Sequence, residues 1–485
     1  MLRQPTDNGG LIHLKKLRPH HIHKEDRIID PYVQEAIKEL QGYDLANDFV
    51  NVTRSYYSLE GHYNNLWKYD HSPDTDVPSD PVLNEARRIT SEAFRLPNPV
   101  RSHSWNSLKD VPFISTSGAG WGYIGKKGEN DNHPLAISRA VSALYRWNEK
   151  RLGLHDKFLY DPDLAWTRTQ LMTFESPKIR NVWGKAFHNI ILEGMTAAPL
   201  INAWSDHGSP MCIGFQYYKR LPILIQSVLK DGDDLNTGVS LDFSGFDQSP
   251  KPWMIHLAFE IVRENLIFTS YYEELAFRYT IEHFIDTPIL MPDGELWLAK
   301  TGVPSGSYFT QIIDSIINHI VITYCQLKTY GRHFKTYVLG DDSLFGVPYD
   351  LGYPRINEFA EHAKTLNFTL HPDKTIIATR PDELDFLGHT ARALRCDRDT
   401  ITMLKLALFP EDPVPSPDVS LSRVRGLTLD SAMNNWPLLH LYEYMTSKYR
   451  GVVSHTPTTT HWLQNAINWT FHPATVDFIK LLTLT

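Results

Sequence analysis

Residues 337–347 read Tyr337-Val338-Leu339-Gly340-Asp341-Asp342-Ser343-Leu344-Phe345-Gly346-Val347, a Gly-Asp-Asp triplet between two apolar runs. Two such runs around a glycine are typical of a β-hairpin, because glycine adopts the backbone conformations that tight turns need. The tip of this hairpin would carry two adjacent carboxylates, which repel each other unless a cation lies between them. The triplet is therefore a candidate cation site, with an ordinary Asp-rich turn as the alternative.

A second pair of carboxylates occurs upstream, where residues 237–247 read Thr237-Gly238-Val239-Ser240-Leu241-Asp242-Phe243-Ser244-Gly245-Phe246-Asp247. The alternation of Val239, Leu241 and Phe243 predicts a strand with one buried face, and Asp242 lies near its end on the other face. Neighbouring strands are about 4.7–4.9 Å apart. If this strand lies beside the hairpin, Asp242 comes within metal-bridging reach of Asp341.

The composition is that of a globular protein, since 42% of the 485 residues are hydrophobic and 21% are charged. No apolar run approaches the length of a transmembrane helix, and the N-terminal residues lack the apolar core of a signal peptide. Cys212, Cys325 and Cys396 do not have the spacing of a zinc site or of a disulfide framework. We therefore expect an intracellular protein without membrane association.

The charge balance argues against a basic protein that coats nucleic acid without specificity, because the net charge is −8 and the pI is about 6.3. The segment 101–190 differs, with 13 Lys and Arg against 8 Asp and Glu. Any nucleic acid would therefore lie in a channel and not over the whole surface.

The loop at 116–128 contains G-x-x-x-x-G-K from Gly120 to Lys126. A phosphate-binding P-loop needs Ser or Thr next and a helix after it, whereas Lys127 and a polar stretch follow here. We interpret the loop as a flexible, basic segment that contacts a nucleic-acid backbone. Lys126 and Lys127 would face phosphates, and Trp121 or Tyr123 would be available for stacking.

Lys178 and Arg180 are two residues apart, so in an extended segment both point to one side, while Ile179 points to the other and can anchor the segment. Two cations on one side suit a triphosphate. The alternative is a pair of solvated cations on an edge strand.

The segment Gly302–Thr310 contains a proline and two glycines and is predicted to be a loop. The helix expected after it has one apolar face and one polar face, the latter formed by Gln311, Asp314, Ser315 and Asn318. This face lacks the Lys and Glu of a solvated surface and suits hydrogen bonding to sugar hydroxyls. The alternative is an amphipathic helix whose polar side chains are merely short.

Other segments carry weaker signals. The N-terminal His20, His21 and His23 could bind a metal, although a solvated arm is the alternative. Residues 368–375 predict a strand ending in a turn near Lys374, and Asp385–His389 predicts a short apolar strand. Four prolines within 410–417 predict a linker before a mostly helical subdomain at about 418–485.

The order of these motifs resembles that of viral RNA-dependent RNA polymerases, and the residues around the motifs are most similar to those of the partitivirus type. The resemblance covers about residues 116–390 and rests on six ordered motifs: Lys178-x-Arg180, Asp242-x4-Asp247, Ser305-Gly306-x3-Thr310, Gly340-Asp341-Asp342, Lys374 and Phe386-Leu387-Gly388. It implies an α+β right-hand fold. The implied division is an N-terminal region leading into the fingers (1–100), fingers (101–235), palm (236–250), a fingers insertion (251–300), palm (301–405) and thumb (406–485).

The resemblance also implies roles for individual residues. Asp242, Asp341 and Asp342 would hold two Mg²⁺ ions, or Mn²⁺, and Lys374 would protonate the leaving pyrophosphate. Lys178 and Arg180 would bind the incoming nucleoside triphosphate (NTP). RNA contacts are implied for Gly306, Thr310 and Phe386 beside Lys126 and Lys127.

The ribose 2′-hydroxyl would be read by Asp247, Ser305 and the residue nine positions after Ser305. The commoner family pattern has Asn at that third position, whereas this sequence has Asp314 there and Asn318 one helical turn later. Either residue is a candidate for the sugar contact.

We therefore expect template-directed RNA synthesis by a two-metal mechanism that replicates and transcribes a viral double-stranded RNA genome. The expected partners are template and product RNA, NTPs and a viral capsid protein, in the virion interior and the host cytoplasm. Two alternatives are a reverse transcriptase with the same carboxylates and an inactive RNA-binding protein that keeps a polymerase-like core.

Overall fold

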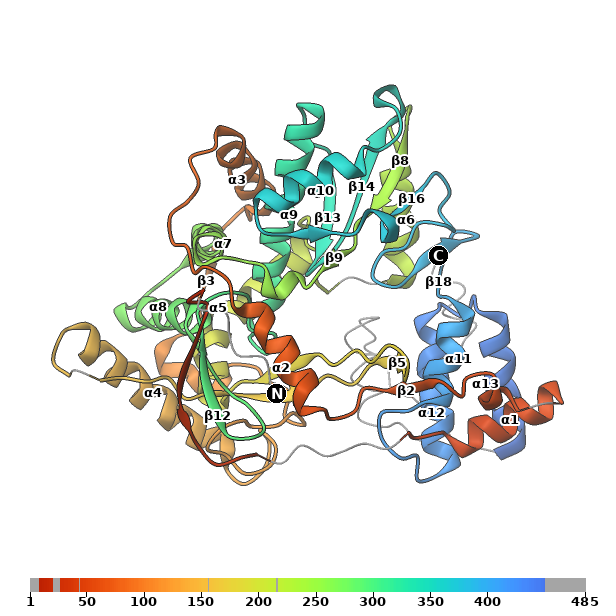
Figure 1. Ribbon diagram of the computed structural model, residues 1–485, viewed down its shortest axis with the longest axis horizontal. Coiled ribbons are helices and arrows are strands. Elements are labelled where there is room, and N and C mark those ends of the chain that lie inside the picture. Colours follow the sequence, from red (N-terminus) through yellow and green to blue (C-terminus); the bar gives the residue numbers. More distant parts are fainter. Residues whose placement is uncertain (1–7, 21–26, 43, 156, 215–216, 450–485) are drawn as a thin grey trace.

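The computed structural model describes residues 8–20, 27–42, 44–155, 157–214 and 217–449. These residues form three parts, which we call palm, fingers and thumb after the fold expected from the sequence. In Figure 1 the palm lies at the top, the fingers at the lower left and the thumb at the lower right.

The palm is built on a sheet in which the predicted hairpin and the predicted upstream strand are neighbours. Its strands run in the order β13 (Thr336–Leu339), β14 (Asp342–Pro348), β8 (Asp234–Ser240) and β16 (Ile376–Ala378), all antiparallel, and β7 (Lys230–Asp231) pairs with the start of β8. Gly340 takes a φ of 62° at the hairpin turn, the left-handed conformation that favours glycine. The hairpin and the strand pairing are confirmed.

Helices cover both faces of the palm sheet because its strands alternate their apolar side chains. Phe345 and Val347 of β14 enter a large core shared with the helices α3 (Pro81–Phe94), α7 (Pro252–Glu264), α9 (Thr310–Tyr330) and α10 (Ile356–Thr365). Leu344 points the other way and belongs to a second core with α6 (Tyr217–Leu229) and the hairpin of β17 (Thr390–Arg392) and β18 (Arg395–Asp397). The sheet is thus fixed on both faces, and its turn remains at one edge.

The fingers contain a second five-stranded sheet. Its order is β1 (Leu11–Lys16), β12 (Glu295–Ala299), β11 (Thr287–Leu290), β4 (Asp163–Thr167) and β6 (Asn181–Gly184). The helices of this part are α2 (Leu59–Leu66), α4 (Asn132–Arg151), α5 (Phe187–His207) and α8 (Tyr271–Ile285). Two short strand pairs complete it: β3 (Val100–Arg101) with β10 (Leu266–Ile267), and β2 (Val52–Arg54) with β5 (Leu171–Thr173).

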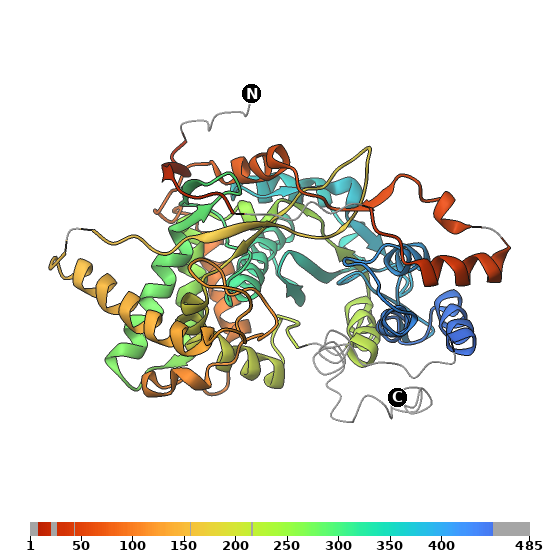
Figure 2. The ribbon, with the colours of Figure 1, turned by 90° about the horizontal axis from the view of Figure 1, so that it is seen from below.

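The thumb combines one helix of the N-terminal region with the last three helices of the described chain. Helices α11 (Thr400–Leu408), α12 (Pro417–Asp430) and α13 (Trp436–Tyr449) share one apolar core with α1 (Pro31–Gln41), and both ribbon views show α1 beside them (Figures 1 and 2). Asp30 caps α1 and also accepts a hydrogen bond from Arg423 at 2.5 Å. The N-terminal region therefore contributes β1 to the fingers sheet and then α1 to the thumb, which the local sequence pattern does not indicate.

One predicted element is wrong. Asp385–His389 is a tight turn and not a strand, since Phe386 and His389 bridge each other and Leu387 and Gly388 both have positive φ. The apolar residues of this segment point into the palm core, which produced the strand-like pattern. Within the described ranges, no helix has the length and apolarity to cross a bilayer.

Candidate active site

Carboxylates from the two distant segments meet at the open edge of the palm sheet. β14 pairs with β8 as far as Phe345 opposite Val239; Asp342 is the first residue of β14, and Asp242 follows two residues after the end of β8. Desolvation by the surrounding protein, together with the charges of Asp341, Asp385 and Asp242, raises the pKa of Asp342 to about 7. The side chains of both segments therefore share one electrostatic environment.

Two further carboxylates belong to the same cluster. Burial and the charge of Asp341 raise the pKa of Asp247 to about 6, while nearby Arg168 and Arg180 oppose this shift. Asp314, on α9, has its pKa raised well above the ordinary value by burial and by the charges of Asp247 and Asp341. The site thus concentrates negative charge and has arginines on one side of it.

The polar face of α9 holds the Gly-Asp-Asp turn. Ser315 accepts the N–H of Gly340 at 2.9 Å, and the side-chain amide of Asn318 donates to the carbonyls of Gly340 at 2.9 Å and Asp342 at 3.3 Å. Asp314 is also buried, but within the described part of the chain its Oδ1 has no hydrogen-bond partner. The amide nitrogen of Asn318 is therefore engaged by the turn, whereas Oδ1 of Asn318 and Oδ1 of Asp314 both remain acceptors without a partner among the described residues.

The loop before α9 is packed against β6 and the palm. The N–H of Trp183 donates to the Ser305 hydroxyl at 3.3 Å, and the N–H of Val303 donates to the carbonyl of Asp247 at 2.6 Å. A Cβ added at Gly306 would lie only 1.7 Å from the carbonyl oxygen of Trp183, so glycine is required for this close approach. The packing brings Ser305 and Asp247 to the same region of the site.

The predicted pair of cations lies on an exposed extended segment that leads into β6. Ile179 packs against Gly61 of α2, so its predicted anchoring role is confirmed. Lys178 and Arg180 are exposed, but of the two only Arg180 contributes to the pKa of Asp247. Arg180 is thus the one electrostatically linked to the carboxylates.

Lys374 lies in a short helical turn (Pro372–Lys374) beside the strand end that carries Asp242. The N–H of His371 donates to the carbonyl of Asp242 at 3.0 Å, and β16, which begins at Ile376, pairs with Ser240 of β8. The exposed Lys374 side chain is therefore tethered by its backbone near Asp242.

The loop at 116–128 borders a cavity of about 580 Å³ that extends to Gly306 in the loop before α9. Its lining includes Lys127, Trp166, Trp183 and Gly306. Lys127 is partly buried, which lowers its pKa, and its Nζ donates to the Ser117 hydroxyl at 2.7 Å. Lys127 and Gly306, two predicted RNA contacts, thus line one cavity, whereas exposed Lys126 is not part of its lining.

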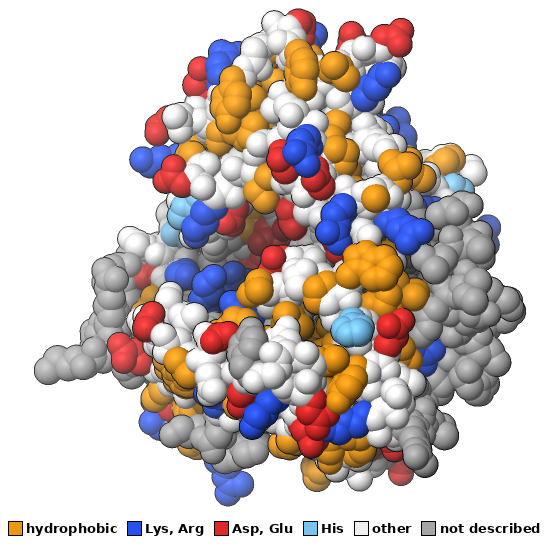
Figure 3. Space-filling model, turned by 90° about the vertical axis from the view of Figure 1, so that its right-hand side faces the viewer, with side chains coloured by type: hydrophobic (Ala, Val, Ile, Leu, Met, Phe, Trp, Pro, Cys, Tyr) orange, Lys and Arg blue, Asp and Glu red, His pale blue; other side chains and the backbone are white. Residues whose placement is uncertain are grey.

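The carboxylate cluster fits a divalent cation whose coordination is completed by a bound substrate. Seen from the thumb side, the surface is hollowed between palm and thumb, with acidic side chains in the hollow and basic ones near its edges (Figure 3). Among the residues that the structure describes, no three Asp, Glu, His or Cys side chains form a ready-made metal site. The raised pKa of Asp342 reflects desolvation first and then repulsion from the neighbouring carboxylates, and a cation would relieve the repulsion. Mg²⁺ typically uses one or two carboxylates together with substrate phosphates.

A family model of viral RNA-dependent RNA polymerases matches residues 29–446. The chain belongs to this polymerase family.

Two relatives of this polymerase chain are each named RNA-directed RNA polymerase. The one from White clover cryptic virus 1 is 24% identical over 408 residues, which are 75% of this chain and 63% of the relative. The one from Cryptosporidium parvum virus 1 is 33% identical over 144 residues, which are 29% of this chain and 27% of the relative. Both support the partitivirus-type resemblance, although the chain spans less than two thirds of the length of either relative.

Solved polymerase structures share the fold. A sicinivirus 3Dpol RNA-dependent RNA polymerase superposes with a TM-score of 0.69 at 14% identity, covering 94% of this chain and 99% of that one. The RNA-dependent RNA polymerase of a human picobirnavirus gives a TM-score of 0.66 at 14% identity, with coverage of 95% and 94%. The expected α+β right-hand fold is confirmed.

Two implied RNA contacts are buried in the structure. Phe386 is 1% exposed and belongs to the α6 core, so its side chain does not reach RNA. The buried Thr310 hydroxyl donates to the carbonyls of Pro304 and Ser307 and thereby shapes the loop. Asn318 holds the turn through its amide nitrogen, whereas its Oδ1 has no hydrogen-bond partner among the described residues, so Asn318 remains a candidate for the sugar contact beside Asp314.

Two residues of the polymerase site were missed from the sequence. Arg168 follows β4, and its N–H donates to the carbonyl of Arg180 at 2.9 Å, so the two arginines are neighbours. Only the pairing of β4 with β6 reveals this proximity. Asp385 raises the pKa of Asp342 and directly precedes the Phe386-Leu387-Gly388 motif. Its position next to that motif could have marked it as a candidate site residue.

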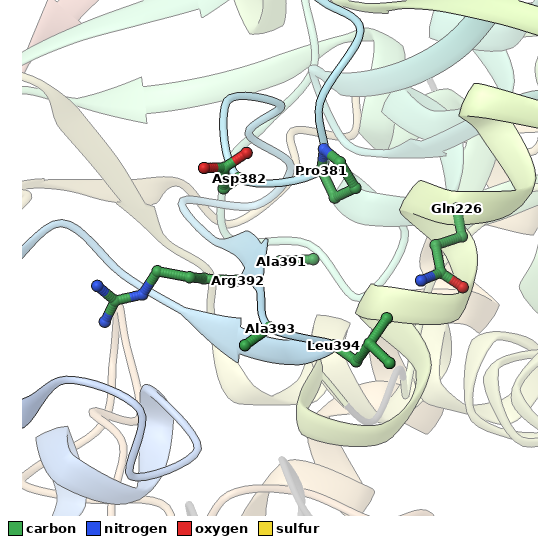
Figure 4. Close-up of a pocket in the computed structure, with 7 residues that line it drawn as sticks. All are labelled: Gln226, Pro381, Asp382, Ala391, Arg392, Ala393 and Leu394. Carbon is green, nitrogen blue, oxygen red and sulfur yellow. The ribbon is translucent and has the colours of Figure 1, made fainter.

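A second cavity, of about 300 Å³, lies between α6 and the β17–β18 hairpin (Figure 4). Ala391, Ala393 and Leu394 give it an apolar wall, and Asp382 and Arg392 are its charged lining residues. None of the clustered carboxylates lines it, so it contributes nothing to the site described here.

Proposed function

We propose that this protein is an RNA-directed RNA polymerase that adds ribonucleotides from NTPs to a growing RNA strand. The observation that carries the proposal is the pairing of β14 with β8, which brings Asp342 and Asp341 near enough to Asp242 that the charges of Asp341 and Asp242 both raise the pKa of Asp342. The names of the two viral relatives and the family match support the same activity.

Divalent cations are part of the proposal, with Mg²⁺ as the first candidate and Mn²⁺ as the second. Asp242 and Asp341 would hold them, with Asp342 adjacent. When bound, two such ions would stabilise the attacking 3′-oxygen and the leaving pyrophosphate. The mutual repulsion of the carboxylates supports this assignment.

The chain's own residues would bind and orient the nucleotide. Arg180, Lys178 and the neighbouring Arg168 would neutralise the triphosphate, since guanidinium groups bind phosphate oxygens in bidentate geometry. Asp247 and Ser305 would face the ribose. Asp314 and Asn318 are both candidates for the third sugar contact, because the buried Oδ1 of each lacks a hydrogen-bond partner among the described residues.

Lys374 would supply the proton for the leaving pyrophosphate. Its exposed ammonium group follows the backbone contact between His371 and Asp242, near the end of β8. An ammonium group is a hydrogen-bond donor that can give up a proton, so this side chain can act as a general acid.

Single-stranded template RNA would pass the 116–128 loop. The cavity there combines Lys127 with the exposed aromatic side chain of Trp166, a combination that suits backbone charge neutralisation and base stacking. The exposed Lys126 would contact phosphates outside the cavity.

The biological setting is also part of the proposal. The enzyme would replicate and transcribe a viral double-stranded RNA genome, in the virion interior and the host cytoplasm, in contact with a capsid protein and with the product duplex. The partitivirus-type relatives support this setting.

A primer-extension assay with Mg²⁺ and a defined single-stranded RNA template tests the activity. We expect the parent to incorporate ribonucleotides and the Asp341→Ala variant to lose at least about 10³-fold of the rate, with RNA binding nearly unchanged. Preferential incorporation of deoxyribonucleotides would identify a reverse transcriptase instead. RNA binding without any synthesis would favour an inactive binding protein.

A further inference from the structure

A buried ion pair joins the strand that follows Arg180 to the interior of the fingers. Lys185 comes directly after β6, and its side chain is fully buried. Its Nζ lies 3.2 Å from Oε1 of Glu193 on α5 and 3.5 Å from Oδ2 of Asp163 on β4. One cation is thus shared between two buried carboxylates.

The second oxygen of Glu193 holds the loop that carries Ser305. Its Oε2 accepts the N–H of Tyr308 at 2.8 Å, and Tyr308 is three residues after Ser305. A hydrogen bond to an ionised carboxylate is roughly twice as strong as a bond between neutral groups. The loop is therefore anchored on a charge that Lys185 balances.

The same loop also touches β6 directly. The N–H of Trp183 donates to the Ser305 hydroxyl, and the carbonyl of Trp183 leaves no space for a side chain at Gly306. Lys185 lies only two residues beyond Trp183. Strand and loop are consequently connected at two places, so a shift of one displaces the other.

Packing alone does not explain this arrangement. Replacing buried ion pairs with apolar residues of similar volume is often neutral or stabilising, because charges are costly to bury. Here burial, together with the charge of Glu193, raises the pKa of Asp163 to about 6 even though Lys185 is adjacent. A site that retains such charges has a use for directed, charge-assisted bonds.

We propose that Lys185 and Glu193 form a positioning pair that fixes the Ser305 loop relative to the strand of Arg180, so that the ribose and the triphosphate of one nucleotide are held in register. This inference rests on the proposed function, because it assigns the two ends of the pair to two parts of one NTP. Neither residue needs to touch the substrate.

The Glu193→Gln variant tests the pair. It keeps the side-chain shape and an acceptor oxygen for Tyr308, but it removes the charge that Lys185 balances. We expect faster hydrogen exchange in peptides that cover residues 302–310, and a discrimination between ribonucleotides and deoxyribonucleotides that is about tenfold lower, the equivalent of one charge-assisted hydrogen bond. Lys185→Arg, which keeps the cation, should retain more of both properties than Lys185→Met.

Glu273→Gln is the matched control. Glu273 is another buried carboxylate of the fingers, on α8, and it accepts the N–H of Thr269 at 2.7 Å. This variant should leave the exchange of 302–310 and the discrimination unchanged. If Glu193→Gln lowers thermal stability but changes neither property, the pair is structural and the proposal is overturned.

The two proposals fail separately. If the parent incorporates no nucleotide, the proposed polymerase activity is wrong, yet hydrogen exchange still reports whether Glu193 anchors the loop. If the parent synthesises RNA and Glu193→Gln matches it in exchange and in discrimination, only the positioning pair is refuted.

Discussion

The side-chain amide of Asn318 donates a hydrogen bond to the backbone carbonyl of Gly340, 2.9 Å away. The same amide reaches the carbonyl of Asp342, and Ser315 accepts the N–H of Gly340. Both backbone groups of Gly340 are thus satisfied by α9, so the aspartates that follow Gly340 have their direction set by a helix. The polar face of α9 therefore holds the Gly-Asp-Asp turn by hydrogen bonds and also lines the site.

Removing the hydrogen bonds from Asn318 should destabilise the Gly-Asp-Asp turn. In Asn318→Ala the carbonyl of Gly340 loses a buried donor, which costs about 1–2 kcal/mol of unfolding free energy. Asn318→Asp should be worse, because it replaces the donor by an acceptor that faces two carbonyl oxygens. Urea unfolding and primer extension measure both effects.

Asn434→Ala is the control for Asn318. Asn434 also donates from its amide to a backbone carbonyl, that of Arg392, but at a partly exposed site. It should lose less stability and keep the parent rate of synthesis. Equal losses in the two variants would contradict a special role of the α9 contact.

Asp314 should determine sugar selection. If its free carboxylate oxygen accepts the ribose 2′-hydroxyl, Asp314→Ala should lower the preference for ribonucleotides over deoxyribonucleotides by at least about tenfold, the value of one hydrogen bond of 1.4 kcal/mol. The measurement is kcat/KM for matched ribo- and deoxyribonucleotides on one template. A preference equal to that of the parent would remove Asp314 from the ribose site.

Sequence patterns predicted the elements in which neighbouring residues carry the signal. The hairpin around Gly340 and the two faces of α9 follow from local alternation and helical spacing. Arg168 was missed because its place beside Arg180 depends on strand pairing between β4 and β6, which no local pattern encodes.

Phe386 was misjudged for a different physical reason. A short apolar run fits both a strand and a buried turn, and only the positive φ of Leu387 and Gly388 separates the two. The contact of α1 with the thumb is likewise a long-range event, since Asp30 meets Arg423 near the other end of the described chain. Long-range packing is the information that a single sequence lacks.

His319 should make stability depend on pH. It is buried between α9 and α3, where Thr90 hydrogen-bonds its Nδ1, and burial lowers its pKa to about 3. The unfolded chain has the ordinary value near 6.5 and therefore binds more protons between pH 6.5 and 3. Stability contributed by the neutral imidazole is thus present at neutral pH and is lost as the pH falls through this window.

This loss should amount to about 2 kcal/mol between pH 7 and pH 5 for one such histidine. His319→Phe, which keeps an aromatic ring next to Phe94, should show a correspondingly smaller loss over the same interval. Urea unfolding at the two pH values provides the comparison. His440, exposed on α13, supplies the control, and His440→Phe should leave the pH dependence unchanged.

The repulsion among the clustered carboxylates predicts a trade-off between stability and activity. Asp342 has its pKa raised to about 7, so its ionised form is disfavoured in the folded protein and stability should fall as the pH rises from about 4 toward 7. Asp342→Asn removes this repulsion, and the variant should unfold at a higher temperature than the parent at pH 8 without divalent ions. Added Mg²⁺ should raise the unfolding temperature of the parent more than that of the variant, because only the parent gains the full relief of charge.

Asp350→Asn, which alters an exposed carboxylate beside Arg332, should show neither effect. Because sites that bind charged ligands give up stability for function, a variant that is more stable without the ion yet slower in RNA synthesis is the expected combination; a less stable Asp342→Asn would mean that the carboxylates do not repel each other in the folded protein.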